Sequence, residues 1–383
     1  MRIDKFKVEE WMNEYEKYSK FDLGNTTVNT LSLDDLFKIT NTNKEKFFEE
    51  LSSKKLGYGY ITGNPELKQG ICSFYKTLTQ SDVLPTIGAA GANHLVFYSL
   101  IEPQDSVISV IPTYQQLYSI PKSFNADVKF LHLKPENNFL PDINELKNLI
   151  TPKTKMICLN NPNNPSGSLI PLKLLEEIIE IARKKDIWIL CDEVYRELNQ
   201  KESSCQSIAD LYEKGISICS MSKTFSLAGL RLGWIASKNK KIIDACIQHR
   251  EYNMISCSIL DEAIASLALK HSEKIIKKNQ KILCENLEVL DNWVKTQEHF
   301  SYIKPKAGTT ALLYYDLNIT SEEFCRRLAK EKGVFLTPGF CFELEYCFRA
   351  GYGKDKKILA QGLNKISEFV EENRGLYGRR IFK

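Results

Sequence analysis

Short apolar segments alternate with amphipathic helical segments from about residue 84 onward, and this alternation limits the folds open to the chain. Several of the segments are apolar on both faces, as strands inside a parallel sheet are. The predicted strands are Ser106–Ile111, Val128–Leu131, Lys155–Asn160, Ile187–Asp192, Ile216–Ser220 and Leu232–Ala236. One intervening helix has on a single face Leu172, Leu175, Ile179 and Ala182. The pattern predicts a parallel α/β sheet with functional residues at the carboxyl ends of its strands.

The pattern changes after residue 270, where one long helix precedes short strand signals and a final amphipathic helix. The strand signals are Thr309–Asp316, Val334–Thr337 and Cys347–Ala350. Near the N-terminus we expect a helix over Lys7–Lys20 and a single amphipathic stretch from Leu33 to Phe48. These features predict a large α/β domain over 31–272 and a smaller α+β domain built from 1–30 and 273–383.

Charge and cysteine content disfavour several classes of function. The chain has 52 Lys and Arg against 48 Asp and Glu, and the basic residues are dispersed among acids, so we expect no nucleic-acid partner. The first residues are charged and no window approaches the ~18 to 20 apolar residues of a membrane span, so we expect neither a signal peptide nor a membrane protein. Eleven cysteines fall singly and five histidines lack metal-ligand spacing, so we expect a cytoplasmic protein with reduced thiols and no metal.

The segment Ser220–Gly233 carries Lys223, three residues after Ser220 and eight before Arg231. A lysine amine forms an imine with an aldehyde, whereas a hydroxyl and a guanidinium both suit a phosphate. Pyridoxal 5′-phosphate is an aldehyde that carries a phosphate, and it acts as an electron sink beside an amino-acid nitrogen. The segment therefore predicts a pyridoxal-phosphate site. The alternative is a basic strand-to-helix turn whose serine is there by chance.

Two further segments suit the same ligand. Gly88–Asn93 opens a helix with small residues, and its backbone N–H groups form an anion site, although close packing of helix on strand explains the small residues about equally well. Tyr114 follows the strand Ser106–Ile111, where its ring either stacks on a pyridine or caps a domain edge.

Polar residues that end or follow later strands add to this set. Asn164 can donate to a phenolate oxygen, unless its segment only builds a turn. Asp192 ends a very apolar strand and needs a partner there, either a protonated pyridine nitrogen or a structural arginine. Tyr195 can reach the 3-oxygen of the same ring. Arg349 lies inside an apolar strand, and its planar fork suits the carboxylate of an amino-acid substrate or of a structural Asp or Glu.

In their joint order these segments resemble the class I/II aminotransferases, which are fold-type I pyridoxal-phosphate enzymes, over nearly the whole chain. The matching segments are Tyr58–Leu67, Gly88–Asn93, Pro112–Tyr114, Asn164–Gly167, Asp192–Arg196, Ser222–Phe225, Arg231–Gly233 and Phe348–Arg349. The resemblance implies a large domain with a mostly parallel sheet of seven strands between helices, together with a smaller α+β domain. It also implies a homodimer with active sites at the interface.

The resemblance implies a role for each matching residue. Lys223 forms the imine with the cofactor and then moves a proton between the substrate Cα and the cofactor. Asp192 keeps the pyridine nitrogen protonated, and Arg349 binds the substrate α-carboxylate. It places around the phosphate Ala89, Ala90, Ser220, Ser222, Arg231 and Tyr58 of the other subunit. It also implies that Tyr195 and Asn164 bind the 3-oxygen, that Asn164 also borders the substrate, and that Tyr114 stacks on the ring. Beside the carboxylate it places Asn25 and Thr26.

The resemblance predicts an aminotransferase that moves an α-amino group from an amino acid to a 2-oxo acid. Ala89 and Ala90 replace the hydroxyl residue of some relatives, and no second arginine is marked for an acidic side chain. The run Lys223–Leu230 also resembles the carbon–sulfur lyase branch, which tends to lack an arginine at the position of Arg231. A carbon–sulfur β-lyase, or a cyclase or oxidase of a specialised amino acid, is the alternative. A non-catalytic sensor or scaffold is disfavoured because Lys223 and Asp192 are both present.

Overall fold

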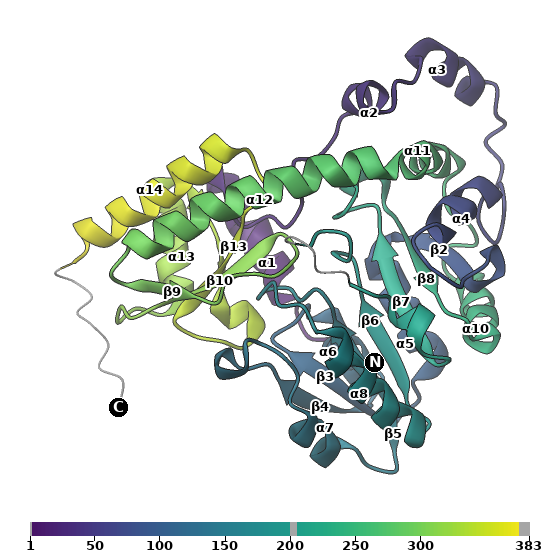
Figure 1. Ribbon diagram of the computed structural model, residues 1–383, viewed down its shortest axis with the longest axis horizontal. Coiled ribbons are helices and arrows are strands. Elements are labelled where there is room, and N and C mark those ends of the chain that lie inside the picture. Colours follow the sequence, from purple (N-terminus) through teal and green to yellow (C-terminus); the bar gives the residue numbers. More distant parts are fainter. Residues whose placement is uncertain (1, 200–204, 375–383) are drawn as a thin grey trace.

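The central sheet has seven strands, and one of them runs antiparallel to the other six (Figure 1). The computed structural model describes residues 2–199 and 205–374. In spatial order the strands are β2 (Val83–Ile87), β8 (Leu232–Ala236), β7 (Gly215–Ser220), β6 (Trp188–Asp192), β5 (Thr154–Asn160), β3 (Ser106–Ile111) and β4 (Asp127–His132). β8 is antiparallel to β2 and β7, and the other neighbouring pairs of this sheet are parallel. This arrangement confirms the predicted mostly parallel α/β fold.

Strand register brings the functional ends of the sheet together. Asn160 at the end of β5 lies opposite Asp192 at the end of β6, and Asp192 lies opposite Ile218 on β7. Ser220, the last residue of β7, lies opposite Gly233 on β8. The carboxyl ends of β5, β6 and β7 therefore share one edge, which is where ligands bind in open α/β sheets.

Helices cover both faces of this sheet (Figure 1). One core cluster lies between the sheet and α5 (Gly88–Leu100), α6 (Gln116–Ser123) and α10 (Lys240–Arg250). A second cluster lies between the other face and α7 (Ile143–Leu149), α8 (Leu172–Lys184) and α9 (Ile208–Leu211). Leu175, Ile179 and Ala182 of α8 are buried as expected, but Leu172 is exposed because it is the first residue of the helix.

A smaller antiparallel sheet packs with both ends of the chain (Figure 1). Its strands in order are β12 (Thr337–Pro338), β13 (Cys347–Gly351), β10 (Thr310–Tyr315) and β9 (Phe300–Tyr302). The helices around it are α1 (Lys7–Tyr15), α12 (Ser272–Thr296), α13 (Ser321–Lys332) and α14 (Lys356–Glu372). Beside them β1 (Phe21–Asp22) pairs in parallel with β11 (Val334–Phe335). No helix in the described ranges is long and apolar enough to cross a membrane.

Two helix boundaries differ from the sequence prediction. The stretch Leu33–Phe48 forms two helices, α2 (Leu33–Thr40) and α3 (Lys44–Ser52), because Asn41 adopts a left-handed conformation with φ 55° and Asn43 caps α3. The first helix ends at Tyr15, and one 3₁₀ turn follows it. Asparagine is common at helix ends, as at Asn41 and Asn43, because its short side chain can form hydrogen bonds with nearby backbone groups. The remaining helices are α4 (Pro65–Cys72) and α11 (Ile259–Lys270).

Gly351 tests how tightly the N-terminal segment is held against the small sheet. Its N–H donates to Leu23 O at 2.7 Å, and a Cβ at this position would lie 2.0 Å from Asn25 O. We expect Gly351→Ala to lower the free energy of unfolding by about 1–3 kcal/mol, because backbone must move to admit the methyl group. Urea unfolding measures this, with Gly57→Ala as control, because a Cβ at Gly57 would have no neighbour within 4 Å. Equal stability of the two variants would contradict this packing.

Candidate active site

A cavity of about 290 Å³ opens at the shared edge of the large sheet, next to β13 and α1. It collects nearly all the residues that the sequence singled out, from both sheets and from the N-terminal segment. The predicted residues that line it are Asn25, Thr26, Ala89, Ala90, Tyr114, Asn164, Asp192, Tyr195, Ser220, Ser222, Lys223, Arg231 and Arg349. Tyr58 is the exception, since it is 69% exposed on the loop before α4 and does not line the cavity.

The corner formed by β2, α5 and β8 depends on two glycines. Gly88 has φ 65°, a conformation that favours glycine, and a Cβ there would lie 2.7 Å from a terminal nitrogen of Arg231. A Cβ on Gly233 would lie 2.6 Å from the backbone nitrogen of Ala89. The first turn of α5 can therefore approach both β8 and the Arg231 guanidinium. Helix N–H groups and a guanidinium in one corner form an anion site.

Lys223 projects from the segment after β7 into the cavity. Its Nζ donates a hydrogen bond to Thr26 Oγ1 at 2.6 Å. Loss of hydration, helped by the positive charges of Arg349 and Arg231, lowers the pKa of Lys223 to about 8. The amine therefore gains a neutral form much closer to physiological pH than an ordinary lysine does.

Asp192 ends β6 with its carboxylate buried. It accepts hydrogen bonds from Val194 N and from Asn93 Nδ2, both at 3.3 Å, and burial raises its pKa to about 6. Asp192 forms no ion pair within the described ranges, so the structural arginine that could have explained it does not pair with it. Asn93 Oδ1 is buried without a hydrogen-bond partner there. Asn93 is a contact that sequence reasoning missed; its only signal was an amide in an otherwise apolar helix.

Arg349 reaches the cavity from β13 and is almost fully buried. Its guanidinium donates to Asn164 Oδ1 at 3.1 Å, to Gly24 O at 2.7 Å and to Thr337 Oγ1 at 2.9 Å. Its Nε has no hydrogen-bond partner, and no carboxylate pairs with Arg349 in the part of the chain that the structure describes. A buried guanidinium without an acidic partner can receive the carboxylate of a ligand.

Two tyrosines complete the walls of the cavity. Tyr195 is buried, and desolvation raises its pKa although the nearby hydroxyls of Thr26 and Thr309 oppose this shift. The phenol of Tyr114 donates to Glu9 Oε1 at 3.3 Å. Glu9, with Val8 and Met12 of α1, also lines the cavity. These three residues carry no distinguishing pattern in the sequence, and sequence reasoning missed them.

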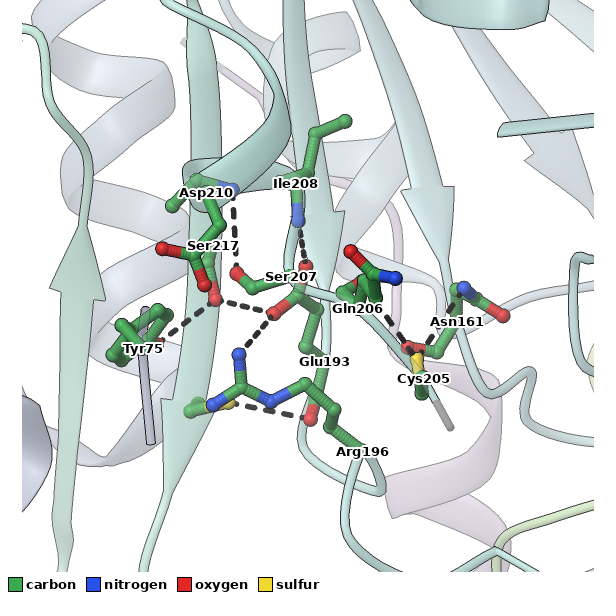
Figure 2. A network of polar contacts seen from close by, with 12 residues as sticks. Tyr75, Asn161, Glu193, Arg196, Cys205, Gln206, Ser207, Ile208, Asp210 and Ser217 are labelled. Carbon is green, nitrogen blue, oxygen red and sulfur yellow. Dashed lines mark hydrogen bonds and ion pairs between the residues drawn. The ribbon is translucent and has the colours of Figure 1, made fainter. Parts of the chain in front are cut away.

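A buried polar network holds the turn that follows Asp192 (Figure 2). Glu193 accepts from Ser217 Oγ and from Ile208 N, both at 2.7 Å, and it pairs with Arg196 at 3.4 Å. The Arg196 guanidinium lies over the ring of Tyr75, 4.4 Å from its centroid. The structural arginine of this segment thus pairs with Glu193, which leaves the Asp192 carboxylate for the cavity.

Comparisons with known proteins give one consistent result. The family model described as aminotransferase class I and II matches residues 22–366. A crystal structure of a PLP-dependent aminotransferase from Streptococcus suis is 42% identical, with a TM-score of 0.94, 97% of this chain and 99% of that chain covered. A histidinol-phosphate aminotransferase from Methanococcus maripaludis is 31% identical, with 85% of each chain covered. Capreomycidine synthase from Streptomyces vinaceus is 24% identical, with 94% of this chain and 92% of the synthase covered.

The lowered pKa of Lys223 predicts how its reactivity depends on pH. Only the neutral amine attacks an acylating reagent, so the modification rate of Lys223 in ligand-free protein should rise through pH 8 and level off above it. An ordinary lysine in a reference peptide should still gain reactivity up to about pH 10.4. Brief acetylation followed by peptide mass analysis measures both rates. A rate for Lys223 that follows the reference peptide would contradict the lowered pKa.

Proposed function

We propose that this chain, which belongs to the class I and II aminotransferase family, transfers an α-amino group between an amino acid and a 2-oxo acid. Family membership makes it an enzyme that depends on pyridoxal 5′-phosphate. When bound, that cofactor supplies an aldehyde for amines and an electron sink for the carbanion formed at the substrate Cα. The particular amino acid and oxo acid are not specified by the family.

The residues of the cavity fit this cofactor. Asp192 is a buried carboxylate with no cationic partner in the described ranges, as a counter-ion for a protonated pyridine nitrogen must be. Lys223 offers an amine of lowered pKa for the aldehyde. The Gly88 turn and the Arg231 guanidinium form an anion site for the phosphate. Each chemical feature of the cofactor therefore has a matching group on the cavity wall.

In the proposed complex, several groups of residues hold the cofactor, and each group binds one part of it. Asn164 and Tyr195 bind the 3-oxygen, and Tyr114 covers the ring. The phosphate is bound by backbone at Ala89 and Ala90 and by side chains of Ser220, Ser222 and Arg231. Arg349 donates a hydrogen bond to Asn164 Oδ1 at 3.1 Å, and this contact positions Asn164. The NH₂ group of Asn164 is then left to donate elsewhere.

The proposed chemistry rests on Lys223 and Arg349 lining the same cavity. Arg349 binds the substrate α-carboxylate, and backbone at Asn25 and Thr26 borders it. Lys223 Nζ would move the proton from the substrate Cα to the cofactor, and its pKa of about 8 suits both taking up and giving off a proton near neutral pH. Thr26 Oγ1, 2.6 Å from Nζ, holds the amine in place. The buried guanidinium without an acidic partner is the observation that carries this proposal.

A second candidate is an elimination or ring closure that uses the same proton transfer. The relative named capreomycidine synthase, which matches over 94% of this chain, supports the cyclase alternative. A carbon–sulfur β-lyase would also begin with removal of the Cα proton. These reactions differ from transamination in their products, since they release a cyclic amino acid, or ammonia and a thiol, instead of a 2-oxo acid with the amine retained on the enzyme.

We also propose that the enzyme is a homodimer with shared sites. Exposed apolar side chains occur on the loop before α4 and on the segment that leads into α11; they are Leu56, Tyr58, Tyr60, Ile61, Tyr252, Ile255 and Leu260. The two segments touch, since a Cβ on Gly59 would lie 2.5 Å from Ile259. A second copy of the chain would cover this patch and could bring its Tyr58 to the phosphate.

Transamination is tested by adding single amino acids, without any oxo acid, to the holoenzyme. The visible absorbance of the bound cofactor should fall as an equimolar amount of 2-oxo acid appears, and added oxo acid should restore it. Lys223→Ala should slow the exchange by about 100- to 10,000-fold, because it removes the group that moves the proton. Lys46→Ala, at an exposed site on α3, is the control. Steady release of ammonia, thiol or a cyclic product would instead establish the second candidate.

Shared sites are tested by mixing two impaired variants. We expect Lys223→Ala and Tyr58→Ala each to be nearly inactive, and co-expressed chains to recover activity because one site of each mixed dimer then has neither defect. Sedimentation should give twice the chain mass of 44.0 kDa. Mixed dimers that form but recover no activity would show that Tyr58 does not act in the other subunit's site.

A further inference from the structure

We propose that Glu9 selects amino acids whose side chain ends in a cation, an ammonium or a guanidinium group. The inference rests on the proposed function, because it takes the cavity to be an amino-acid site. Glu9 lies on α1, and its carboxylate borders the cavity together with the apolar side chains of Val8 and Met12. A wall that is apolar except for one carboxylate suits a side chain with an aliphatic stem and a positive end.

The position of Glu9 is held by contacts of α1 residues on either side of it. Lys7 N donates to Gln115 Oε1 at 2.9 Å, and Trp11 Nε1 donates to Leu336 O at 2.8 Å. The Trp11 contact joins α1 to the segment next to Thr337, which binds Arg349. The Glu9 carboxylate itself accepts from the phenol of Tyr114 at 3.3 Å. Glu9 is therefore fixed in relation to both the ring-covering tyrosine and the arginine proposed to bind the α-carboxylate.

The charges of the cavity leave Glu9 without an assigned partner. Its charged wall residues are Glu9, Asp192, Lys223, Arg231 and Arg349. The proposed function gives Asp192 to the pyridine nitrogen, Arg231 to the phosphate, Arg349 to the α-carboxylate and Lys223 to the proton. Only the Glu9 carboxylate has no counterpart among the cofactor and the common part of an amino acid.

The lysines close to Glu9 along the chain do not neutralise it. Both precede Glu9 and pair elsewhere, Lys5 with Glu10 at 3.0 Å and Lys7 with Glu343 at 2.6 Å. Across the ranges 2–199 and 205–374, Glu9 itself is in no ion pair, and its hydrogen bond comes from a neutral phenol. Its charge also reaches the reacting groups, because it opposes the lowering of the pKa of Lys223. A cation at the end of the substrate side chain would form an ion pair with this carboxylate.

The negative charge of Glu9 disfavours amino acids with acidic or uncharged aliphatic side chains. An acidic side chain would be repelled by Glu9, and among the described residues the only arginines that line the cavity are Arg231 and Arg349, both already assigned. An uncharged aliphatic side chain would displace water from the carboxylate without forming a hydrogen bond or an ion pair with it. Selection therefore combines attraction of one class with rejection of two others.

The test compares pairs of amino acids that differ by the terminal amine, ornithine with norvaline and lysine with norleucine. Wild-type holoenzyme should convert the cationic member with a kcat/KM roughly tenfold higher, and Glu9→Gln should bring the ratio of the two kcat/KM values close to one. The preference should also weaken as salt is raised, because Glu9 is exposed to solvent. Glu10→Gln, which changes the exposed neighbour paired with Lys5, is the matched control and should keep the preference.

Binding of unreactive analogues separates this inference from the proposed reaction. α-Methylornithine and α-methylnorvaline lack the Cα proton, so their dissociation constants, read from the cofactor spectrum, do not depend on turnover. Tighter binding of α-methylornithine to wild type, lost in Glu9→Gln and kept in Glu10→Gln, would support selection by Glu9 even if no amino group is transferred. Equal binding of the two analogues to wild type, or an unchanged ratio in Glu9→Gln, would overturn it whatever the products are.

Discussion

The site depends on a buried carboxylate that never faces the ligand. Glu193 takes hydrogen bonds from Ser217 and from the start of α9, and it pairs with Arg196 (Figure 2). Because both charged groups are buried, removing Arg196 would leave the Glu193 carboxylate without its cation at a cost of about 3–5 kcal/mol. The turn from Asp192 to Leu198 is thereby locked. Asp192 and Tyr195, which border that turn, have their positions set by contacts among residues that do not line the cavity.

The cavity also needs a second source of order, because the large sheet alone does not close it. Arg349 comes from β13 of the small sheet, and Thr26 comes from the segment between β1 and α2. Their meeting depends on close backbone contacts, such as Gly351 N to Leu23 O at 2.7 Å. The amine of Lys223 therefore donates its hydrogen bond to a residue 197 positions away. Such distant pairings position the groups proposed to bind the substrate, whereas the large sheet positions those proposed to bind the cofactor.

Much of the large sheet was predictable because its strands are apolar on both faces. The predicted strands Ser106–Ile111 and Leu232–Ala236 match β3 and β8 in full. Predictions were weaker where a single side chain or an end effect decides, as in the break at Asn41 between α2 and α3 and the exposure of Leu172. Propensity and periodicity average over a turn or more, so they do not register one left-handed residue or one helix end.

By itself the sequence determined which chemical groups this protein carries and which strand ends present them, since motif order and strand periodicity are local properties. Only the tertiary structure decided which of two adjacent carboxylates keeps the arginine: Arg196 pairs with Glu193, and Asp192 is left for the cavity. It also brought Glu9 into the site, from a helix whose sequence carries no such signal, and it placed Asn93 against Asp192, a contact that the predicted segment Gly88–Asn93 did not specify. The physical reason is that burial and pairing depend on groups far apart along the chain, and these meet only when the two sheets and α1 pack together.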